Sequence, residues 1–190
     1  MKSPERELHG LKDLEGAAAN LVDTIASHKA TVLFWYGTAC PCVLRYHERI
    51  HALRDAFATQ EVAFVAIASN ADDDAKRVDE SRQARGFELP ILMDPQGRFA
   101  VKMGVRSTPT VVILDDLGQV RFRGWIDNER LPGVEGRIPY AENVLQSILT
   151  PNAPRVAEKS PAYGCRITRA LGEASECAEV RPSEPPPCTH

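Results

Sequence analysis

Two cysteines separated by a single proline, Cys40 and Cys42, are the residues of this chain most suited to chemistry. They follow directly on a hydrophobic run, in the stretch TVLFWYGTACPCVL that covers residues 31–44. Two thiols this close together, where a strand gives way to a helix, favour either disulfide exchange or the binding of a soft metal. The simpler interpretation is a pair of inert cysteines at a buried helix start.

The proline between the cysteines predicts how they are placed. Pro41 fixes its own φ and keeps the preceding residue out of the helical region, so we expect Cys40 as the N-cap and Pro41 as the first helical residue. A sulfur at that point is expected to face the free N–H groups of Cys42 and Val43, at the positive end of the helix dipole. This environment favours a thiolate. Cys40 is therefore the expected nucleophile, and Cys42 the expected resolving partner.

Composition limits the classes of function. The chain has 190 residues, 43% hydrophobic and 26% charged, with a net charge of −3. These values are typical of a globular protein with one good core. The chain has no basic stripe that would favour nucleic acid and no apolar run long enough to span a bilayer. The first residues, MKSPERELHG, lack the apolar centre of a signal peptide, so the sequence favours a cytoplasmic location, with the mature form of an exported protein as the alternative.

Hydrophobic periodicity predicts alternating strands and helices up to residue 150. Strands are expected at 31–36, 62–69, 91–94, 110–115 and 120–125, and helices at 17–27, 41–57, 72–85, 98–104 and 140–149. A β-α-β run, a hairpin and a last helix make an α/β fold, with one central mixed sheet covered by helices on both faces.

The last forty residues differ in composition. Residues 151–190 hold seven of the fourteen prolines and three of the five cysteines, so we divide the chain into a domain at 1–150 and a Pro-rich tail at 151–190, partly disordered or docked through Cys165. Cys165 lies in AYGCRI, a semi-apolar patch. It is either a further resolving thiol that folds back toward Cys40 and Cys42, or a solvent thiol or tail disulfide with Cys177 or Cys188.

Three separate motifs carry a resemblance to a known family: FWYGTACPCV, the turn MDPQG, and STPT before the strand VVIL. Together they resemble the thioredoxin-fold superfamily, and more narrowly the redoxin and alkyl hydroperoxide reductase/thiol-specific antioxidant (AhpC/TSA-like) branch, over roughly residues 8–149. The resemblance implies a redox-active cysteine site with antioxidant or thiol-disulfide oxidoreductase activity. It also implies a cis Pro109, with the backbone of Thr108 free to pair with an extended substrate. Trp35, just before the site, is a candidate substrate contact or a core residue.

The cysteine spacing departs from that family, in which two residues separate the cysteines. Counting from Trp35 makes Cys42 the second family cysteine, whereas counting from Gly37 makes Cys40 the first. A Cys40–Cys42 disulfide would close a small, easily reduced ring, which suits an oxidant or an isomerase. The buried acid of many thioredoxins should fall near Leu33, which is apolar.

The sequence thus predicts a thiol-disulfide oxidoreductase that needs no cofactor, acts on protein or small-molecule thiols and disulfides, and depends on a reductant partner. The alternative is a copper(I)-binding or delivery protein that uses the same thiolates. A thiol peroxidase is less favoured, because residues 36–39 do not reproduce the peroxidatic pattern. His47 and His51 lie one helical turn apart, but about 10 Å along the helix from Cys40, so a solvated face is favoured over a metal site. Asp72, Asp73 and Asp74 suit a helix N-terminus better than a cation site.

Overall fold

The structure is a computed structural model of the chain that describes residues 10–128, 136–153, 158–160 and 164–169. Its helices are α1 (Leu21–Ala26), α2 (Pro41–Ala56), α3 (Ala75–Arg85), α4 (Arg98–Lys102) and α5 (Tyr140–Leu149). Its strands are β1 (Ala30–Tyr36), β2 (Val62–Ala68), β3 (Ile91–Met93), β4 (Ser107–Thr108), β5 (Val111–Asp115), β6 (Val120–Gly124), β7 (Glu158–Lys159) and β8 (Cys165–Arg166). No helix among the described residues is both long and apolar enough to cross a membrane.

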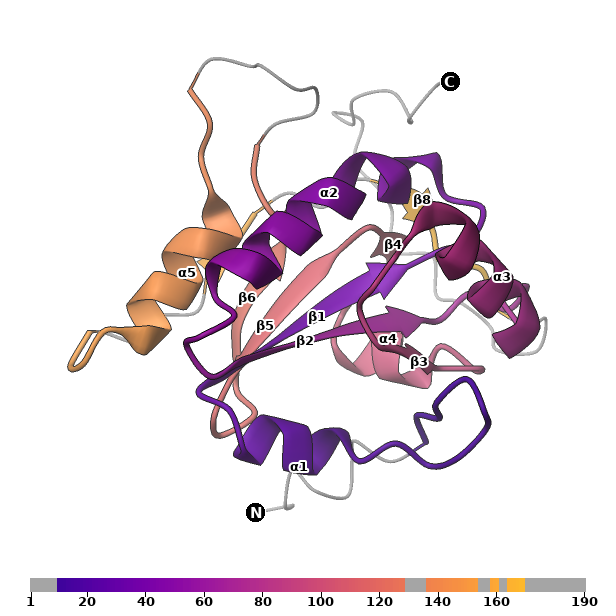
Figure 1. Ribbon diagram of the computed structural model, residues 1–190, viewed down its shortest axis with the longest axis horizontal. Helices are drawn as coiled ribbons and strands as arrows, with labels where there is room; N and C mark the ends of the chain where they lie inside the picture. The colour runs from indigo at the N-terminus through magenta and orange to yellow at the C-terminus, as the bar shows by residue number, and fades with distance from the viewer. Residues whose placement is uncertain (1–9, 129–135, 154–157, 161–163, 170–190) are drawn as a thin grey trace.

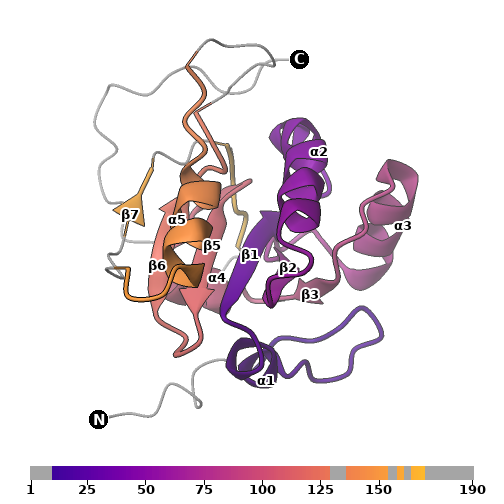
Figure 2. The ribbon, with the colours of Figure 1, turned by 60° about the vertical axis from the view of Figure 1, so that its left-hand side comes forward.

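The strands form a mixed sheet in the order β3-β2-β1-β5-β6-β7 (Figures 1 and 2). Strand β1 lies parallel to β2 and antiparallel to β5, so it is paired along both edges. Every residue of β1 is buried, as expected for a strand whose two faces are both covered. The predicted α/β class and the central mixed sheet are confirmed.

Alternate residues of β1 point into two separate hydrophobic clusters. Phe34 and Tyr36 pack with residues of α2, α3 and α5 on one face, whereas Leu33 and Trp35 pack with residues of α1 and α4 on the other. Figure 2 shows the sheet between these helices. Both cysteines of the Cys-Pro-Cys stretch belong to the first cluster, at the carboxyl end of β1.

Two short segments beyond residue 150 lie on the domain. Residues 158 and 159 form β7, which pairs in parallel with β6 at the edge of the main sheet. Cys165 and Arg166 form β8, which pairs antiparallel with β4 in a separate two-stranded sheet (Figure 1). Neither strand is predicted by the sequence, because two-residue strands carry no hydrophobic periodicity.

Candidate active site

The first cysteine lies at the junction of β1 and α2. Cys40 has extended backbone angles (φ −88°, ψ 111°) and is the N-cap of α2, with Pro41 at the first helical position. This is the helix start that the proline predicts. Cys40 is 3% exposed and Cys42 is 2% exposed, so both side chains are almost fully buried.

The sulfur of Cys40 does not face the helix N–H groups as expected. The Cys40 side chain makes no capping hydrogen bond. Its thiol instead donates to the carbonyl oxygen of Thr108, at 3.1 Å. The physical reason is that a protonated thiol needs an acceptor, and the helix N-terminus offers only donors.

Thr108 lies in the loop that leads into β5. The Thr108–Pro109 peptide bond is cis. Thr108 is 1% exposed, and the neighbouring Thr110 accepts a hydrogen bond at its carbonyl from the backbone N–H of Trp35, at 2.8 Å. This loop is thereby held against β1, and the Thr108 carbonyl is held against Cys40.

Residues 164–169, which we call the strap, run along the same loop. Cys165 is the register partner of Thr108 in the β4–β8 pair, and Arg166 is the partner of Ser107. Further along, Ile167 N–H donates to the Arg106 carbonyl at 3.0 Å. The strap therefore takes the place of an added strand at the edge of the cis-proline loop.

The strap brings a third sulfur to the site. The sulfur atoms of Cys40, Cys42 and Cys165 all lie within 4.8 Å of one another. Cys40 and Cys165 are free thiols in this structure. Cys165 is half-buried, so it is the more accessible of these two. Cys177 and Cys188, the other tail cysteines, lie outside the described residues.

The environment of Cys165 holds it as a thiol. Burial raises the pKa of Cys165 from its ordinary value of 9.0 to about 11, and a hydrogen bond to Cys40 acts in the same direction. The backbone N–H of Cys42 lowers the pKa of Cys165, but by less. The sequence predicts that the N–H group of Cys42 faces the sulfur of Cys40. In the structure it contacts the sulfur of Cys165 instead.

Two side chains that the sequence does not single out for the site hold the loop before Cys40. Asp73 is 6% exposed and accepts hydrogen bonds from the backbone N–H of Thr38 at 3.3 Å, from the Thr38 hydroxyl, and from Asn70 at 2.9 Å. Arg85 of α3 donates to the carbonyls of Gly37 and Thr38. These contacts fix the backbone of Gly37 and Thr38, which lies just before Cys40 and positions it at the start of α2.

The aspartate run divides into separate roles. Asp74 is the N-cap of α3 and accepts a hydrogen bond from Arg77 N–H at 2.8 Å, as expected for an acid at a helix N-terminus. Asp73 turns the other way, toward Thr38. Three adjacent aspartates look alike in sequence, so only the fold distinguishes the one that supports the site.

Trp35 contacts the loop of Thr108 to Thr110 through its backbone, and its side chain lies in the core. It is fully buried in the second cluster, stacks on Phe99 with ring centroids 5.8 Å apart, and donates from its indole N–H to Ser69 at 3.1 Å. Because side chains of a strand alternate between faces, Trp35 points away from the face that holds Cys40. The burial of the side chain agrees with the core interpretation of Trp35, and its contact with substrate stays a prediction.

The two histidines of α2 pack on a neighbouring aromatic ring. His47 and His51 have ring centroids 4.5 Å apart, and both rings contact Phe87. Nε2 of His51 accepts a hydrogen bond from the Glu88 N–H at 3.2 Å. Among the described residues, the one group of side chains with metal-ligating geometry is the three cysteines, and neither histidine belongs to it.

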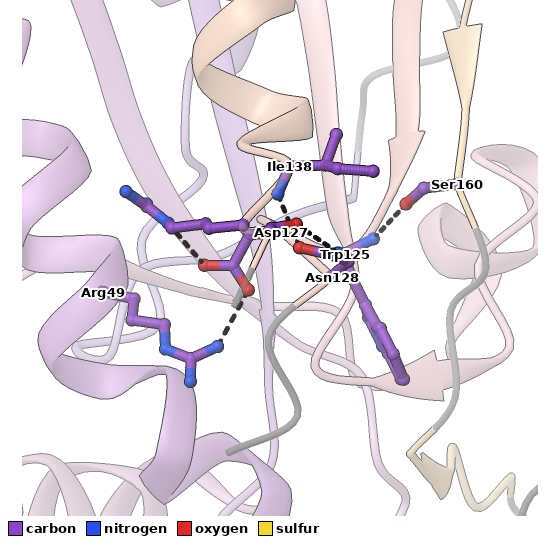
Figure 3. Close-up of polar contacts among 8 residues, drawn as sticks. Arg49, Trp125, Asp127, Asn128, Ile138 and Ser160 are labelled. Carbon is purple, nitrogen blue, oxygen red and sulfur yellow. Dashed lines mark hydrogen bonds and ion pairs between the residues drawn. The ribbon is translucent and has the colours of Figure 1, made fainter. Parts of the chain in front are cut away.

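A buried ion pair anchors α2 to the segment that follows β6. Arg49 donates to Asp127 at 2.8 Å, where Asp127 is fully buried just after β6 (Figure 3). Asp127 also lies 3.6 Å from Arg137. Figure 3 also shows two hydrogen bonds nearby. The Ile138 N–H donates to the Asn128 side chain, and the Trp125 N–H donates to the Ser160 hydroxyl. This network fixes the helix that carries the cysteines.

Solved structures share this fold across most of the chain. A hypothetical protein from Sinorhizobium meliloti 1021 superposes with a TM-score of 0.70 at 24% identity, covering 90% of this chain and 97% of that one. A secreted disulfide oxidoreductase of Mycobacterium tuberculosis superposes with a TM-score of 0.52 at 20% identity, covering 62% of this chain and 83% of that one. At these identities the likeness shows the thioredoxin-like fold.

Curated relatives match the central part of the chain. A "Thioredoxin-like protein" of Haemophilus influenzae is 29% identical over 104 residues, which are 55% of this chain and 59% of the relative. The thiol-disulfide oxidoreductase ResA of Halalkalibacterium halodurans is 26% identical over 110 residues, or 58% of this chain and 60% of ResA. The matched part thus spans about three fifths of each relative's length. The family model described as Redoxin matches residues 2–138, so the chain belongs to the Redoxin family of thioredoxin-like proteins.

Proposed function

We propose that the protein is a thiol-disulfide oxidoreductase in which Cys40 is the nucleophile. The observation that carries this proposal is the placement of the free Cys40 thiol at the start of α2, within 4.8 Å of two further sulfurs. Three cysteines drawn from two distant segments meet at one point, which inert core cysteines do not require. The relatives named as thioredoxin-like and thiol-disulfide oxidoreductase proteins support the same chemistry.

The proposed reaction consists of two successive thiol–disulfide exchanges. The Cys40 thiolate attacks one sulfur of a substrate disulfide, forms a mixed disulfide, and releases the other substrate sulfur as a thiolate that takes up a proton. A second cysteine of the chain then attacks the Cys40 sulfur and releases the remaining substrate thiol. The substrate gains two electrons, and the chain is left with an internal disulfide. An external thiol must then reduce that disulfide, which is the role of the reductant partner.

The α2 N-terminus supplies the electrostatic driving force for this step. When the Cys40 proton leaves, the sulfur loses its reason to face the Thr108 carbonyl, and the N-terminal N–H groups of α2 become its favourable neighbours. The backbone at Thr108 and Pro109 lies beside the sulfurs, and its strand-pairing edge, where an extended substrate could otherwise add, is filled by β8 in this structure. Cys42 is the resolving partner that the sequence suggests, but it is disulfide-bonded in this structure and has no free thiol there.

A glutathione-coupled assay tests this function. The reduced protein should catalyse the reduction of hydroxyethyl disulfide by glutathione, followed as NADPH consumption by glutathione reductase. Cys40→Ser should fall to the rate without protein, while its circular dichroism spectrum and thermal midpoint stay close to wild type. Equal rates for wild type and Cys40→Ser would reject the proposal. Hydrogen peroxide offered in place of the disulfide tests the less favoured peroxidase activity.

Copper(I) binding is the second candidate, favoured by the three sulfur atoms within 4.8 Å of one another. Soft thiolates select Cu(I) over harder cations. Anaerobic titration of the fully reduced protein with Cu(I), in competition with a chromogenic chelator, separates the two functions. A stoichiometric, tightly held Cu(I) ion without any exchange activity would favour the copper protein over the oxidoreductase.

A further inference from the structure

The strap occupies the edge that the proposed function reserves for a substrate. Its β8 pairs with β4, which places Cys165 opposite Thr108. The Thr108 hydroxyl lies 3.5 Å from the Cys165 carbonyl. A substrate strand added at this edge would have to take the same positions. The strap is therefore an internal segment bound in the way that a substrate would be.

A glycine makes this close approach possible. A Cβ atom added to Gly164 would lie 2.1 Å from the Thr108 carbonyl oxygen and 2.8 Å from its carbonyl carbon. Both atoms are backbone, held between the cis peptide bond and Cys40, so neither can move aside. Glycine is the one residue type that lets the strap lie flat against this carbonyl.

The other end of the strap is anchored away from the sulfurs. Ile167 is 6% exposed and packs in the second hydrophobic cluster. Thr168 accepts a hydrogen bond at its carbonyl from Ala71 N–H at 3.0 Å and donates its own N–H to Asn70 at 3.2 Å. These contacts keep the strap attached even when the Gly164–Cys165 end lifts. Cys165 thus stays at high effective concentration beside Cys40.

From these contacts we propose that Cys165 is the resolving thiol of Cys40, an inference that rests on the proposed exchange function. Cys40 and Cys165 are both free thiols, come from separate segments, and contact each other across the α2 N-terminus. A disulfide between them closes no small ring, in contrast to one between Cys40 and Cys42, which are two residues apart.

The resolving step balances as follows. The Cys40 thiolate attacks a substrate disulfide RSSR′, so RS becomes bonded to the Cys40 sulfur as a mixed disulfide, and R′S⁻ departs and takes the proton that Cys40 lost. Cys165 gives up its proton and attacks the Cys40 sulfur. A bond forms between the sulfurs of Cys165 and Cys40, the S–S bond between Cys40 and RS breaks, and RS⁻ takes the proton that Cys165 lost. The chain then holds a Cys40–Cys165 disulfide, which two equivalents of an external thiol such as glutathione reduce.

The same geometry selects the substrate class. Cys40 is 3% exposed beneath the strap, and the strand-pairing edge at Thr108 is already filled. A low-molecular-weight disulfide needs only the Gly164–Cys165 end to lift, whereas an extended polypeptide must replace the whole strap. Small disulfides are therefore the substrates that this arrangement favours.

Trapping experiments on the full chain test the inference. The reduced protein is mixed with glutathione disulfide, quenched with iodoacetamide at timed intervals, and digested without reduction for mass spectrometry. Wild type should yield a linked pair of peptides that contain Cys40 and Cys165. Cys165→Ser should instead accumulate glutathione on Cys40, while Arg166→Ala, which changes an exposed neighbour in the strap, should behave as wild type.

Distinct outcomes separate the two proposals. If glutathione leaves Cys40 as fast in Cys165→Ser as in wild type, the resolving role of Cys165 is wrong, and the exchange function still stands. If Cys40 takes up no glutathione in Cys165→Ser, the exchange function fails and the inference fails with it.

A second variant tests the strap without removing the thiol. Gly164→Ala should displace the strap and so expose Cys40. A typical destabilising substitution would shift the equilibrium between the closed and the lifted strap by about tenfold, and the rate at which iodoacetamide alkylates Cys40 should rise by about the same factor. Unchanged alkylation of Cys40 in Gly164→Ala would show that the strap does not cover it.

Discussion

Asp73 accepts hydrogen bonds from both the backbone N–H and the hydroxyl of Thr38, and so ties the start of α3 to the loop that carries Cys40. The two residues are separated by β2 and α2 in sequence, yet they meet at the carboxyl end of β1. Asp73 contacts no sulfur among the described residues, so it is a positioning residue.

Asp73→Ala is expected to weaken both the fold and the activity. The substitution leaves donors of Thr38 and Asn70 without their acceptor, which costs about 1–3 kcal/mol of unfolding free energy. Misplacement of Cys40 should lower the exchange rate by about ten- to a hundredfold. Urea titration and the glutathione-coupled assay measure the two effects. Asp72→Asn, which changes an exposed neighbour, is the matched control and should leave both unchanged. If Asp73 acted only by stabilising the fold, Asp73→Asn assayed at a low temperature, where the variant is folded, would show full activity. That result would contradict the positioning role.

Removal of the buried carboxylate of Asp127 should destabilise the protein. Asp127→Ala removes the carboxylate that Arg49, whose side chain is 15% exposed, contacts at 2.8 Å. Breaking a buried ion pair by removing one partner costs about 3–5 kcal/mol. Glu80→Ala removes an exposed pair with Lys76 and is the control, with a much smaller expected change. Equal midpoints of urea unfolding for the two variants would contradict the anchoring role of Asp127.

Acidification is expected to weaken the fold through His51. Burial, with help from His47 and Arg54, lowers the pKa of His51 below its ordinary value of 6.5. The unfolded chain therefore binds this proton more readily than the folded chain. The stabilising contribution is present above pH 6.5 and is lost as the pH falls below it. Urea unfolding across this range should show a weaker dependence on pH for His51→Gln than for wild type.

Alkaline conditions should release the Cys165 end of the strap. Because burial raises the pKa of Cys165 from 9.0 to about 11, its contribution to stability is present below pH 9.0 and is lost as the pH rises through about 11. Alkylation of Cys165, followed peptide by peptide, should stay slow near neutral pH and rise steeply only at the upper end of this range. A half-maximal rate near pH 9.0 would mean that Cys165 is not held at the site.

The sequence could predict the parts of this fold that long elements encode. The apolar run of β1 and the stripe of α2 show periodicity over several turns or pairs, and Pro41 marks the helix start directly. The helix bounds at residues 140 and 149 agree with the structure for the same reason. The helix expected at residue 17 instead begins at Leu21, because the Asn20 side chain caps the Asp23 N–H.

The candidate site was less predictable, since its contacts join distant segments. The semi-apolar patch around Cys165 indicates that this thiol can lie near the site, but nothing in the sequence pairs it with Thr108. The hydrogen bond of Cys40 to the Thr108 carbonyl depends on the backbone of a loop 68 residues away. Asp73 stood among three equivalent acids, and Trp35 was ambiguous until the alternation of β1 placed it on the opposite face. Local sequence carries propensity, whereas these roles depend on tertiary contacts.

A redox titration tests the central claim most directly, namely that Cys40 exchanges disulfides. The full-length protein is equilibrated in buffers with a graded ratio of reduced to oxidised glutathione, quenched with acid, alkylated and mapped by mass spectrometry. The account predicts that Cys40 passes reversibly from alkylated to disulfide-bonded over this series, in step with a second cysteine of the chain, and that Cys40→Ser abolishes the paired transition. Complete alkylation of Cys40 at every ratio would contradict it.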